Sequence, residues 1–381
     1  MKILHLIIDH QVIERALSLY EQTFPYCNEV LIFGNNNQYK HLTIHADCEL
    51  VTSHNYEYIA GKVDFSEIKY VVVHYLTFEM IDFIRCIPQN ISVCWEIYGY
   101  DLYNQFLESL GMELYYTSPN KYGSYPYLRL YFPSLFAYLL ELKGCKHRKK
   151  SSIKKEFDYI VNRIDCAAAC CKGDFQLLNS YAGKDIPGFL FCNYSLKETL
   201  GDLWGNPFST GKRVLVGNSA SYSNNHLYVL SYLDKYYKEN DLALLMSLSY
   251  GGSIKYRDEV IGKFKEKYNN IQFLLDYMPL HEYNRIFLDL NAMILSAWRQ
   301  ESIGTIMMGL YLGIKIYMSE KSPLYQSFID WGFKVFTVEG KDLLHIQDPL
   351  SIEHRIHNRE LLLNVFDEKM IVKNLKENFC L

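Results

Sequence analysis

The sequence predicts an α/β protein made of two doubly wound domains. Its 381 residues are too many for one typical domain of about 150 residues and suit two. Short apolar runs rich in β-branched residues alternate with amphipathic helical patterns along both halves, which is typical of parallel sheets. A glycine-rich stretch at residues 201–211 precedes one such run and indicates a boundary. We expect domains at residues 1–205 and 206–350, and a helical segment at 351–381 that packs on the first domain.

The expected strands are continuous apolar runs, as in strands that helices cover on both faces. In the first domain they are Ile3–Ile8, Val30–Phe33, Tyr70–His74, Ser92–Glu96 and Tyr159–Asn162. In the second domain they are Arg213–Val216, Leu242–Ser247, Ile271–Leu275, Ala292–Leu295, Lys315–Met318 and Lys334–Val338. Helices are expected between them, for example at Val12–Gln22. Ligands of such sheets bind at the carboxyl ends of the strands.

Composition excludes several classes of protein. The 39 Lys and Arg against 43 Asp and Glu give a net charge of −4, so nucleic acid is not an expected partner. The ten cysteines form no CxxC pair, and most lie in apolar runs, as reduced thiols do; we expect no metal site. No apolar run approaches the roughly 20 residues of a membrane span, so a cytoplasmic protein is expected.

Small and polar residues follow three strands of the second domain. Gly217 lets the backbone approach a phosphate, Arg299 offers a cation, and a helix begins near Ser302, where free N–H groups favour anions. The predicted diphosphate site comprises Gly217, Asn218, Ser219, Asn224, Tyr250, Arg299, Gln300, Glu301, Ser302, Gly304 and Thr305. Each loop alone is equally an ordinary turn before a helix, and a GxGxxG fingerprint, which a Rossmann dehydrogenase would carry, is absent.

Titratable residues follow the strands of the first domain. Transfer of a group to a hydroxyl needs a general base within hydrogen-bond reach. The sequence favours Asp101 and His74 for this role, with Asp9 as a third candidate. Contacts to the acceptor or sugar are expected from His10, Glu96 and Tyr98. Alternatively, Asp101 caps a helix that begins after Gly99.

Three stretches carry a family resemblance: Trp95–Tyr103, Val216–Ser219 with Ser223, Asn224 and His226, and Arg299–Thr305. They resemble glycosyltransferase family 56, which is also labelled a 4-alpha-L-fucosyltransferase family and includes TDP-4-acetamido-4,6-dideoxygalactose:lipid II transferase. The resemblance implies a GT-B fold, in which two Rossmann-like domains face each other across an interdomain cleft. It also implies a nucleotide-sugar donor on the C-terminal domain, a lipid-linked or oligosaccharide acceptor on the N-terminal domain, and no metal or other cofactor. Tyr98 departs from the family, which has a second Trp there.

The resemblance therefore predicts a metal-independent hexosyltransferase. It would move a deoxy- or aminohexose from a TDP-linked donor by direct displacement, in bacterial surface polysaccharide synthesis. Two alternatives stay open: a GT-B sugar-nucleotide enzyme of the epimerase type, and a catalytically inactive sugar-nucleotide-binding protein. A dispensable Asp101 beside an essential Arg299 would favour the inactive binding protein.

One segment predicts contact with a membrane surface. Aromatic residues between Tyr122 and Tyr138 precede clustered Lys and Arg between Lys143 and Lys155, a combination that suits anionic lipid. We expect a peripheral position on the inner face of the cytoplasmic membrane. The alternative is a solvated charge run beside a core helix.

Overall fold

The chain forms two compact units. The computed structural model describes residues 1–34, 42, 48–51, 55–122, 150–193, 195–238 and 241–380. Unit 1 comprises Met1–Met112, Lys150–Leu196 and Val365–Leu381, and unit 2 comprises Glu113–Lys149 and Lys197–Asn364. The division thus differs from the expected boundaries. The chain returns to unit 1 at residue 365, whereas residues 351–364 belong to unit 2.

Unit 1 is built on a parallel sheet with the strand order β3-β2-β1-β4-β5-β6-β7 within the described residues. The strands are β1 (Lys2–Ile7), β2 (Asn28–Phe33), β3 (Cys48–Val51), β4 (Ile68–His74), β5 (Ser92–Glu96), β6 (Cys166–Ala169) and β7 (Gly188–Leu190). Chain order runs outward in one direction from β1 to β3 and in the other from β4 to β7. The switch point between β1 and β4 is where doubly wound sheets bind ligands.

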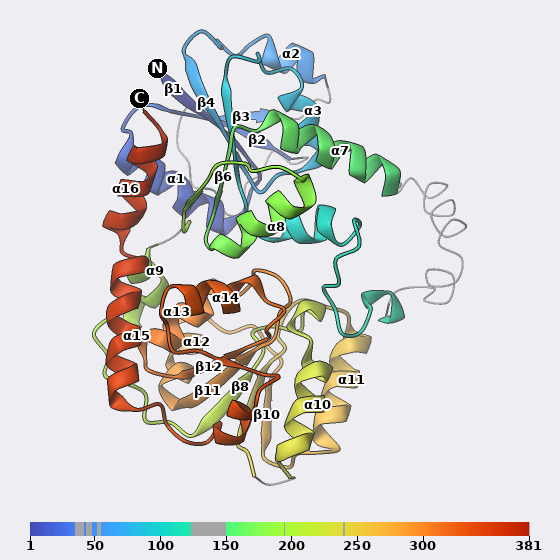
Figure 1. Ribbon diagram of the computed structural model, residues 1–381, viewed down its shortest axis with the longest axis vertical. Helices are drawn as coiled ribbons and strands as arrows, with labels where there is room; N and C mark the ends of the chain where they lie inside the picture. The colour runs from blue at the N-terminus through green and yellow to red at the C-terminus, as the bar shows by residue number, and fades with distance from the viewer. Residues whose placement is uncertain are drawn as a thin grey trace. The chain divides into compact units, whose positions relative to one another are not determined.

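The helices of unit 1 lie between these strands in sequence, except the last one, which follows all strands of the chain (Figure 1). They are α1 (Gln11–Thr23), α2 (Tyr56–Ala60), α3 (Phe78–Ile84), α4 (Tyr100–Leu102) continuing as a π-helical turn at Tyr103–Leu107, α7 (Lys150–Arg163), α8 (Lys172–Ala182) and α16 (Glu368–Asn378). The expectation of a strand at Tyr159–Asn162 is wrong, because these residues lie inside α7. The apolar residues Phe157, Ile160 and Val161 are spaced for one buried helix face, and a short apolar run alone does not distinguish helix from strand.

Unit 2 repeats the same topology. Its parallel sheet has the order β10-β9-β8-β11-β12-β13 within the described residues. The strands are β8 (Arg213–Val216), β9 (Leu244–Ser247), β10 (Ile271–Leu274), β11 (Leu290–Leu295), β12 (Lys315–Met318) and β13 (Phe336–Thr337). The switch point here lies between β8 and β11. Every expected strand of this half is present within a few residues of its expected bounds.

Helices cover both faces of the second sheet. They are α9 (Leu196–Leu200), α10 (His226–Tyr236), α11 (Ile254–Lys265), α12 (Leu280–Ile286), α13 (Ile303–Tyr311), α14 (Pro323–Asp330) and α15 (Ile352–Val365). Figure 1 shows α10 and α11 on one side of the sheet and α12 and α13 on the other. None of the helices in the described part of the chain has the length and apolarity to cross a bilayer.

Candidate active site

The switch point of unit 2 brings together the three loops that the sequence singles out. The loop after β8 and the loop after β11 are joined by Asn225, whose Nδ2 donates to the carbonyl of Ser296 at 3.1 Å. The loop after β9 joins them because the amide of Ala220 donates to the carbonyl of Tyr250 at 2.7 Å. The predicted diphosphate-binding loops therefore meet at one edge of one sheet.

Gly217 needs to be glycine because of its conformation and its neighbours. It has a positive φ of 68°, and a Cβ there would lie 2.6 Å from His226 Nε2 and 3.1 Å from Asn224 Oδ1. Asn224 Oδ1 accepts from the amide of Asn218 at 3.1 Å, and its Nδ2 donates to Ser219 Oγ at 3.1 Å. Asn224 thus braces this loop, while Asn225 occupies the cap position of α10.

The loop after β11 places an ion pair before a helix. Arg299 Nη2 lies 3.1 Å from Glu301 Oε2, and both side chains are mostly buried. Ser302 then turns the backbone with a positive φ of 66°, and α13 begins with Gly304 and Thr305 in its first turn. That turn carries no acidic residue and no side-chain cap. Its N–H groups, which have no intrahelical partners, therefore suit an anion.

Buried polar atoms without a hydrogen-bond partner occur in the same two loops. In the described part of the chain they include Asn218 Oδ1, His226 Nε2, Trp298 Nε1 and Arg299 Nε. Burial lowers the pKa of His226 to about 3, so the ring is neutral, and its Nδ1 lies 3.0 Å from the hydroxyl of Tyr256. Each unpaired buried group costs about 1–3 kcal/mol, and a polar ligand would remove that cost.

Tyr250 and Gln300 complete the predicted set. Tyr250 is 55% exposed, and partial desolvation together with the charge of Glu301 raises the pKa of its hydroxyl. Gln300 is nearly buried. This edge combines a guanidinium, amide donors and an open helix start.

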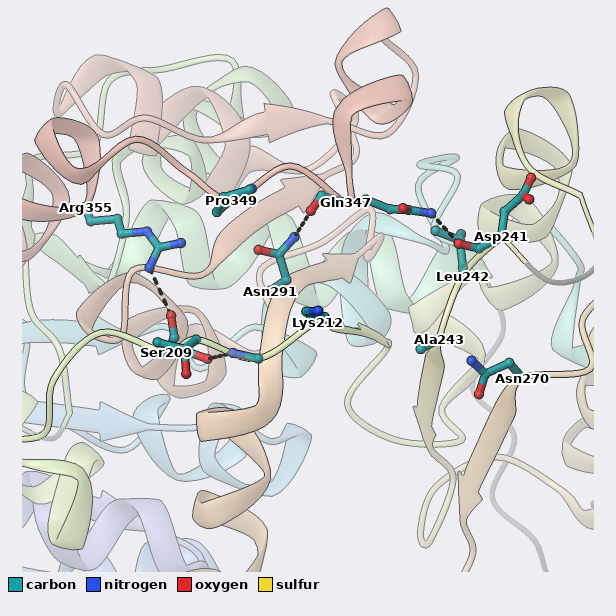
Figure 2. A pocket seen from close by; sticks show the side chains of 12 residues that line it. Ser209, Lys212, Asp241, Leu242, Ala243, Asn270, Asn291, Gln347, Pro349 and Arg355 are labelled. Carbon is teal, nitrogen blue, oxygen red and sulfur yellow. Dashed lines mark hydrogen bonds between the residues drawn. The ribbon is translucent and has the colours of Figure 1, made fainter.

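A pocket of about 530 Å³ lies at the opposite edge of the same sheet (Figure 2). Its lining includes Lys212, Ala243 and Asn270, which directly precede β8, β9 and β10. Several of its polar side chains are bonded to the chain itself. Asn291 Nδ2 donates to the carbonyls of Ile346 and Gln347, and in Figure 2 Arg355 points to Ser209, whose carbonyl accepts from it. We therefore do not place the candidate site in this pocket.

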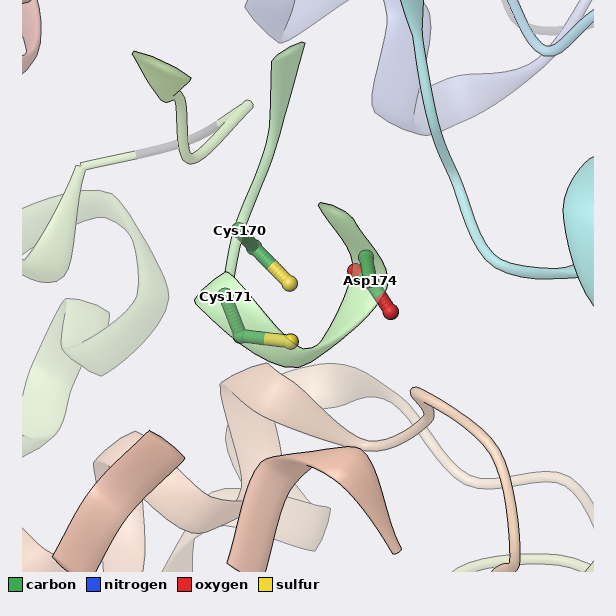
Figure 3. Close-up of side chains that lie close together, drawn as sticks. All are labelled: Cys170, Cys171 and Asp174. Carbon is green, nitrogen blue, oxygen red and sulfur yellow. The ribbon is translucent and has the colours of Figure 1, made fainter. Parts of the chain in front are cut away.

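In unit 1, two adjacent thiols and a carboxylate lie close together where β6 leads into α8 (Figure 3). Among the described residues, Cys170, Cys171 and Asp174 are the group that could hold a metal, with ligand atoms within 4.8 Å of one another. The hydroxyl of Tyr103 donates to Asp174 Oδ1 at 2.5 Å, and burial raises the pKa of Asp174 to about 7. Three ligands fall short of the four of a structural zinc site, so the absence of a metal stays a prediction.

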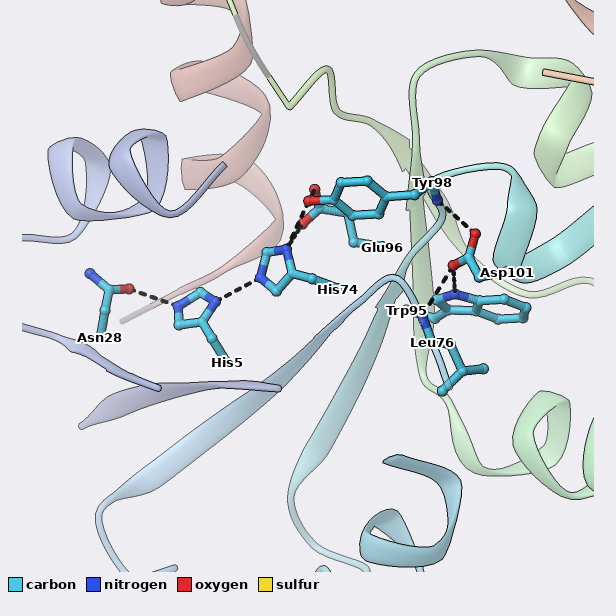
Figure 4. A network of polar contacts seen from close by, with 8 residues as sticks. All are labelled: His5, Asn28, His74, Leu76, Trp95, Glu96, Tyr98 and Asp101. Carbon is cyan, nitrogen blue, oxygen red and sulfur yellow. Dashed lines mark hydrogen bonds and ion pairs between the residues drawn. The ribbon is translucent and has the colours of Figure 1, made fainter. Parts of the chain in front are cut away.

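A chain of buried polar contacts crosses the switch point of unit 1 (Figure 4). Strands β1, β4 and β5 bring together His5, His74 and Glu96, which are nearly or wholly buried. His5 Nε2 lies 3.0 Å from Asn28 Oδ1, and His5 Nδ1 lies 2.9 Å from His74 Nε2. His74 Nδ1 then lies 2.9 Å from Glu96 Oε2 and 3.1 Å from the hydroxyl of Tyr98.

The positions of the protons in this network follow from its ends. Asn28 Nδ2 donates to Glu21 and to the carbonyl of Phe24, so its Oδ1 accepts from His5 Nε2. Burial lowers the pKa of His5 to about 3. The neutral ring of His5 therefore carries one proton, and its Nδ1 accepts from His74 Nε2.

At the other end, the hydroxyl of Tyr98 donates to Glu96 Oε1 at 2.9 Å. His74 Nδ1 lies between the Tyr98 hydroxyl and Glu96 Oε2, so this end of the network is closed by a contact between imidazole and carboxylate. Three of the predicted residues, His74, Glu96 and Tyr98, thus form one unit.

Asp101 lies next to this network and is fully buried. Its Oδ2 accepts from Trp95 Nε1 at 2.8 Å and from the amide of Leu76 at 3.2 Å, and its Oδ1 accepts from the amide of Tyr98 at 3.0 Å. Burial raises its pKa to about 6 despite these donors. The carboxylate thus ties the loop after β4 to the loop after β5.

Asp9 and His10 stand at the carboxyl end of β1 and are partly exposed. Asp9 Oδ1 accepts from the amide of Leu42 at 3.1 Å. His10 caps α1 by accepting from the amide of Val12 through Nδ1, and its ring stacks on Tyr75. Of the three predicted bases, Asp9 reaches the surface, whereas His74 and Asp101 are fully buried.

Comparison with known proteins identifies the family. The sequence pattern of the 4-alpha-L-fucosyltransferase glycosyl transferase group 56 matches residues 170–372, which is more than half of the chain. The protein belongs to glycosyltransferase family 56. No curated protein matches this sequence. The family is that of a transferase, and the two Rossmann-like units agree with a GT-B fold.

Solved structures share the fold of this family 56 enzyme across nearly its whole length. A glycosyltransferase from Rickettsia africae has a TM-score of 0.63 at 12% identity, covering 99% of this chain and 97% of its own. HepE from Anabaena, solved in complex with UDP, has a TM-score of 0.62 at 10% identity, covering 99% of both chains. Sucrose-phosphate synthase from Thermosynechococcus elongatus has a TM-score of 0.61 at 10% identity, covering 99% and 98%. At these identities the likeness shows the GT-B fold alone.

The sequence reasoning missed several residues of this glycosyltransferase. His5 and Asn28 set the protons of the His74 network, and Tyr75 and Tyr100 carry aromatic rings at the same edge. The sequence feature that could have indicated His5 is its place as a polar residue inside the apolar run of a strand. The segment expected to contact a membrane lies mostly outside the described residues, between 123 and 149.

Proposed function

We propose that this glycosyltransferase moves a deoxy- or aminohexose from a TDP-linked sugar to a lipid-linked or oligosaccharide acceptor, in bacterial surface polysaccharide synthesis. The observation that carries the donor assignment is the unit 2 switch point. There, Arg299, an open helix start and unpaired buried polar atoms share two adjoining loops. HepE, which shares the fold, was solved with UDP and with UDP-glucose, and this supports a nucleotide-sugar donor.

In this proposal the loops of unit 2 bind the diphosphate. Gly217 allows the main chain to approach the diphosphate. The amides at the start of α13 and the guanidinium of Arg299 stabilise the negative charge of the diphosphate. Glu301 holds Arg299 in place through their 3.1 Å contact. Donors preorganised toward a growing charge lower the barrier most when they need no reorganisation. Gln300, Ser302 and Thr305 line the same loop and contact the ribose or diphosphate.

Asp9 is our candidate for the general base, because it is the partly exposed carboxylate among the three predicted bases. An acceptor hydroxyl oxygen forms a bond to the anomeric carbon, and its proton passes to the Asp9 carboxylate. The bond between that carbon and the diphosphate oxygen breaks, and the electron pair leaves with the diphosphate. His74 and Asp101 do not touch the acceptor in this proposal; they act as positioning residues that hold the loops after β4 and β5.

Nucleotide binding tests the donor site directly. Ligands that bind the native state raise its apparent stability, so we expect TDP to raise the melting temperature, with UDP and GDP as comparators. Arg299→Ala should remove most of this shift and lower turnover by about 100-fold to 1,000-fold. Arg213→Ala is the matched control, since Arg213 pairs with Asp289 at the amino end of β8. Full turnover in Arg299→Ala would remove the assignment.

We also propose that the enzyme needs no metal and works as a peripheral protein at the inner face of the cytoplasmic membrane. A lipid-linked acceptor would bring it there. Turnover should survive EDTA, and the protein should sediment with vesicles of anionic lipid at low salt. Loss of turnover in EDTA, reversed by a divalent cation, would contradict the first statement. Failure to sediment would contradict the second.

A further inference from the structure

We infer that His10, Tyr75 and Tyr100 form an aromatic platform, a stack of rings whose exposed end at Tyr100 supports a pyranose ring of the acceptor. The inference rests on the proposed function, because it places the acceptor on unit 1. The three residues follow β1, β4 and β5 respectively, and β1 and β4 flank the switch point of that sheet. Ligands of doubly wound sheets bind at this position.

The rings of the platform lie in nearly parallel planes. Tyr75 and His10 have centroids 5.9 Å apart and planes 24° apart, and Tyr75 and Tyr100 have centroids 6.1 Å apart and planes only 8° apart. Most ring contacts in the core of unit 1 are edge-on instead, as for Tyr20 and Tyr70 against Phe379. The rings stack on one another, so the face that a flat ligand can cover is that of Tyr100, the exposed ring at the end of the stack.

The platform is accessible at one end. Tyr100 is 51% exposed, and His10 and Tyr75 are partly exposed. Many other large aromatic residues of unit 1, such as Trp95 and Tyr103, are fully buried. An exposed ring beside partly exposed ones can gain contact area from a ligand without disturbing the core.

The backbone holds the platform in place before any ligand arrives. Tyr75 has a positive φ of 56°. Residues other than glycine avoid this conformation, and the exceptions cluster at functional sites. The Asp101 carboxylate fixes both flanking loops through the amides of Leu76 and Tyr98. Gly99, with φ of 99°, makes the turn that separates Tyr98 from Tyr100.

The chemistry around the rings favours a sugar over a lipid chain. A pyranose presents C–H groups on its flat faces and hydroxyls at its rim, so it suits an aromatic face with polar groups beside it. His10 accepts from the amide of Val12 through Nδ1, so a polar ring forms part of the stack. Asp9, the candidate base, precedes His10 on the same loop. A polyprenyl chain would need a longer apolar surface.

Saturation-transfer NMR on the full chain tests the platform. The probes are methyl β-glucopyranoside, methyl N-acetyl-β-glucosaminide, methyl α-mannopyranoside and, for the lipid, decyl phosphate. With aromatic protons saturated, we expect transfer to the ring protons of at least one pyranoside. Tyr100→Ala should weaken its binding about fivefold to tenfold, and Tyr100→Phe should retain it. Tyr58→Ala is the matched control, since Tyr58 is 61% exposed on α2 of the same unit.

Three results would overturn the inference: no transfer to any pyranoside, transfer that Tyr100→Ala leaves unchanged, or transfer only to decyl phosphate. The thermal shift with TDP is measured on the same samples. If the shift is present while pyranoside transfer fails, the platform is refuted and the donor site stands. If the shift is also absent, the proposed function fails as well.

Discussion

The two sheets of this enzyme have the same order around their switch points but opposite surroundings there. At the edge of unit 2, polar atoms such as Asn218 Oδ1 and Arg299 Nε are buried without partners. At the edge of unit 1, the buried side chains of His5, His74 and Asp101 bond to one another or to backbone amides. One topology thus supports an edge with several unpartnered polar atoms and an edge whose polar groups mostly bond to one another and fix the loops, where Glu96 Oε2 has the ion-pair contact with His74 but no hydrogen-bond partner.

The largest expected effect tests the buried polar network of unit 1. His74→Leu leaves Glu96 buried without its partner, which should destabilise unit 1 by about 3–5 kcal/mol. Hydrogen exchange in β4 and β5 measures it, since it reports on each unit separately. The double variant His74→Leu with Glu96→Leu should recover part of the loss. Unchanged protection of these strands in the single variant would show that the network does not stabilise the unit.

Gly217→Ala tests the open site of unit 2. The positive φ and the approach to His226 Nε2 should together cost about 2–3 kcal/mol, so calorimetry should show TDP binding weakened by about 100-fold. Gly183→Ala is the matched control. Gly183 has φ of 66° and no atom within 4 Å of a Cβ, so it carries the same strain without the contact. Equal TDP affinity in both variants would argue against a donor site at Gly217.

The buried carboxylates of the described residues, Glu96, Asp101 and Asp174, all lie in unit 1. The pKa of Asp174 is raised to about 7 from an unfolded value near 3.9. Between these values the native state binds more protons than the unfolded state, so stability falls as pH rises. We expect unit 1 to lose on the order of 2 kcal/mol between pH 5 and pH 8.

Hydrogen exchange corrected for the intrinsic rate at each pH measures this loss. Asp174→Asn, which keeps the size of the side chain without its charge, should make this part of the pH dependence disappear. A wild-type slope that persists in Asp174→Asn would place the titrating group elsewhere.

The smallest expected effect concerns the support of His226. Tyr256→Phe removes the hydroxyl that bonds Nδ1 of His226, and a hydrogen bond contributes about 1 kcal/mol net. TDP binding should therefore weaken about fivefold in calorimetry, far less than in Gly217→Ala. Tyr268→Phe serves as the control, because the hydroxyl of Tyr268 also lies in unit 2 and has no hydrogen-bond partner. A loss as large as that of Gly217→Ala would mean that His226 contacts the ligand directly.

Sequence patterns predicted the sheets better than the division of the chain. Strands such as β8 and β11 are continuous apolar runs followed by glycine or polar residues, and both features are local. The helix α7 was partly misread because the run Tyr159–Asn162 is too short to show its period. The separation of α15 from α16 depends on contacts far away in sequence, such as Arg359 with the carbonyls of Tyr311 and Asn206.

The same difference holds for the candidate sites. The loops of unit 2 carry their signal in consecutive residues, so the predicted set is brought together at one edge. In unit 1 the partners of His5 are 23 and 69 residues away, and no local pattern pairs them. The sequence did not single out Tyr75 as a site residue. Its ring is directed by a left-handed backbone conformation, which the residue type does not predict.

The last helix bears on the order in which the two units are completed during synthesis. In α16, Ile371 and Leu375 are buried, and the ring of Phe379 just beyond it contacts Tyr20, Tyr70 and Phe189. These residues leave the ribosome after every strand of unit 2. During synthesis the second sheet can therefore bury its core first. The aromatic cluster of unit 1 stays uncovered until α16 has been made, although the last strand of that unit ends at Leu190.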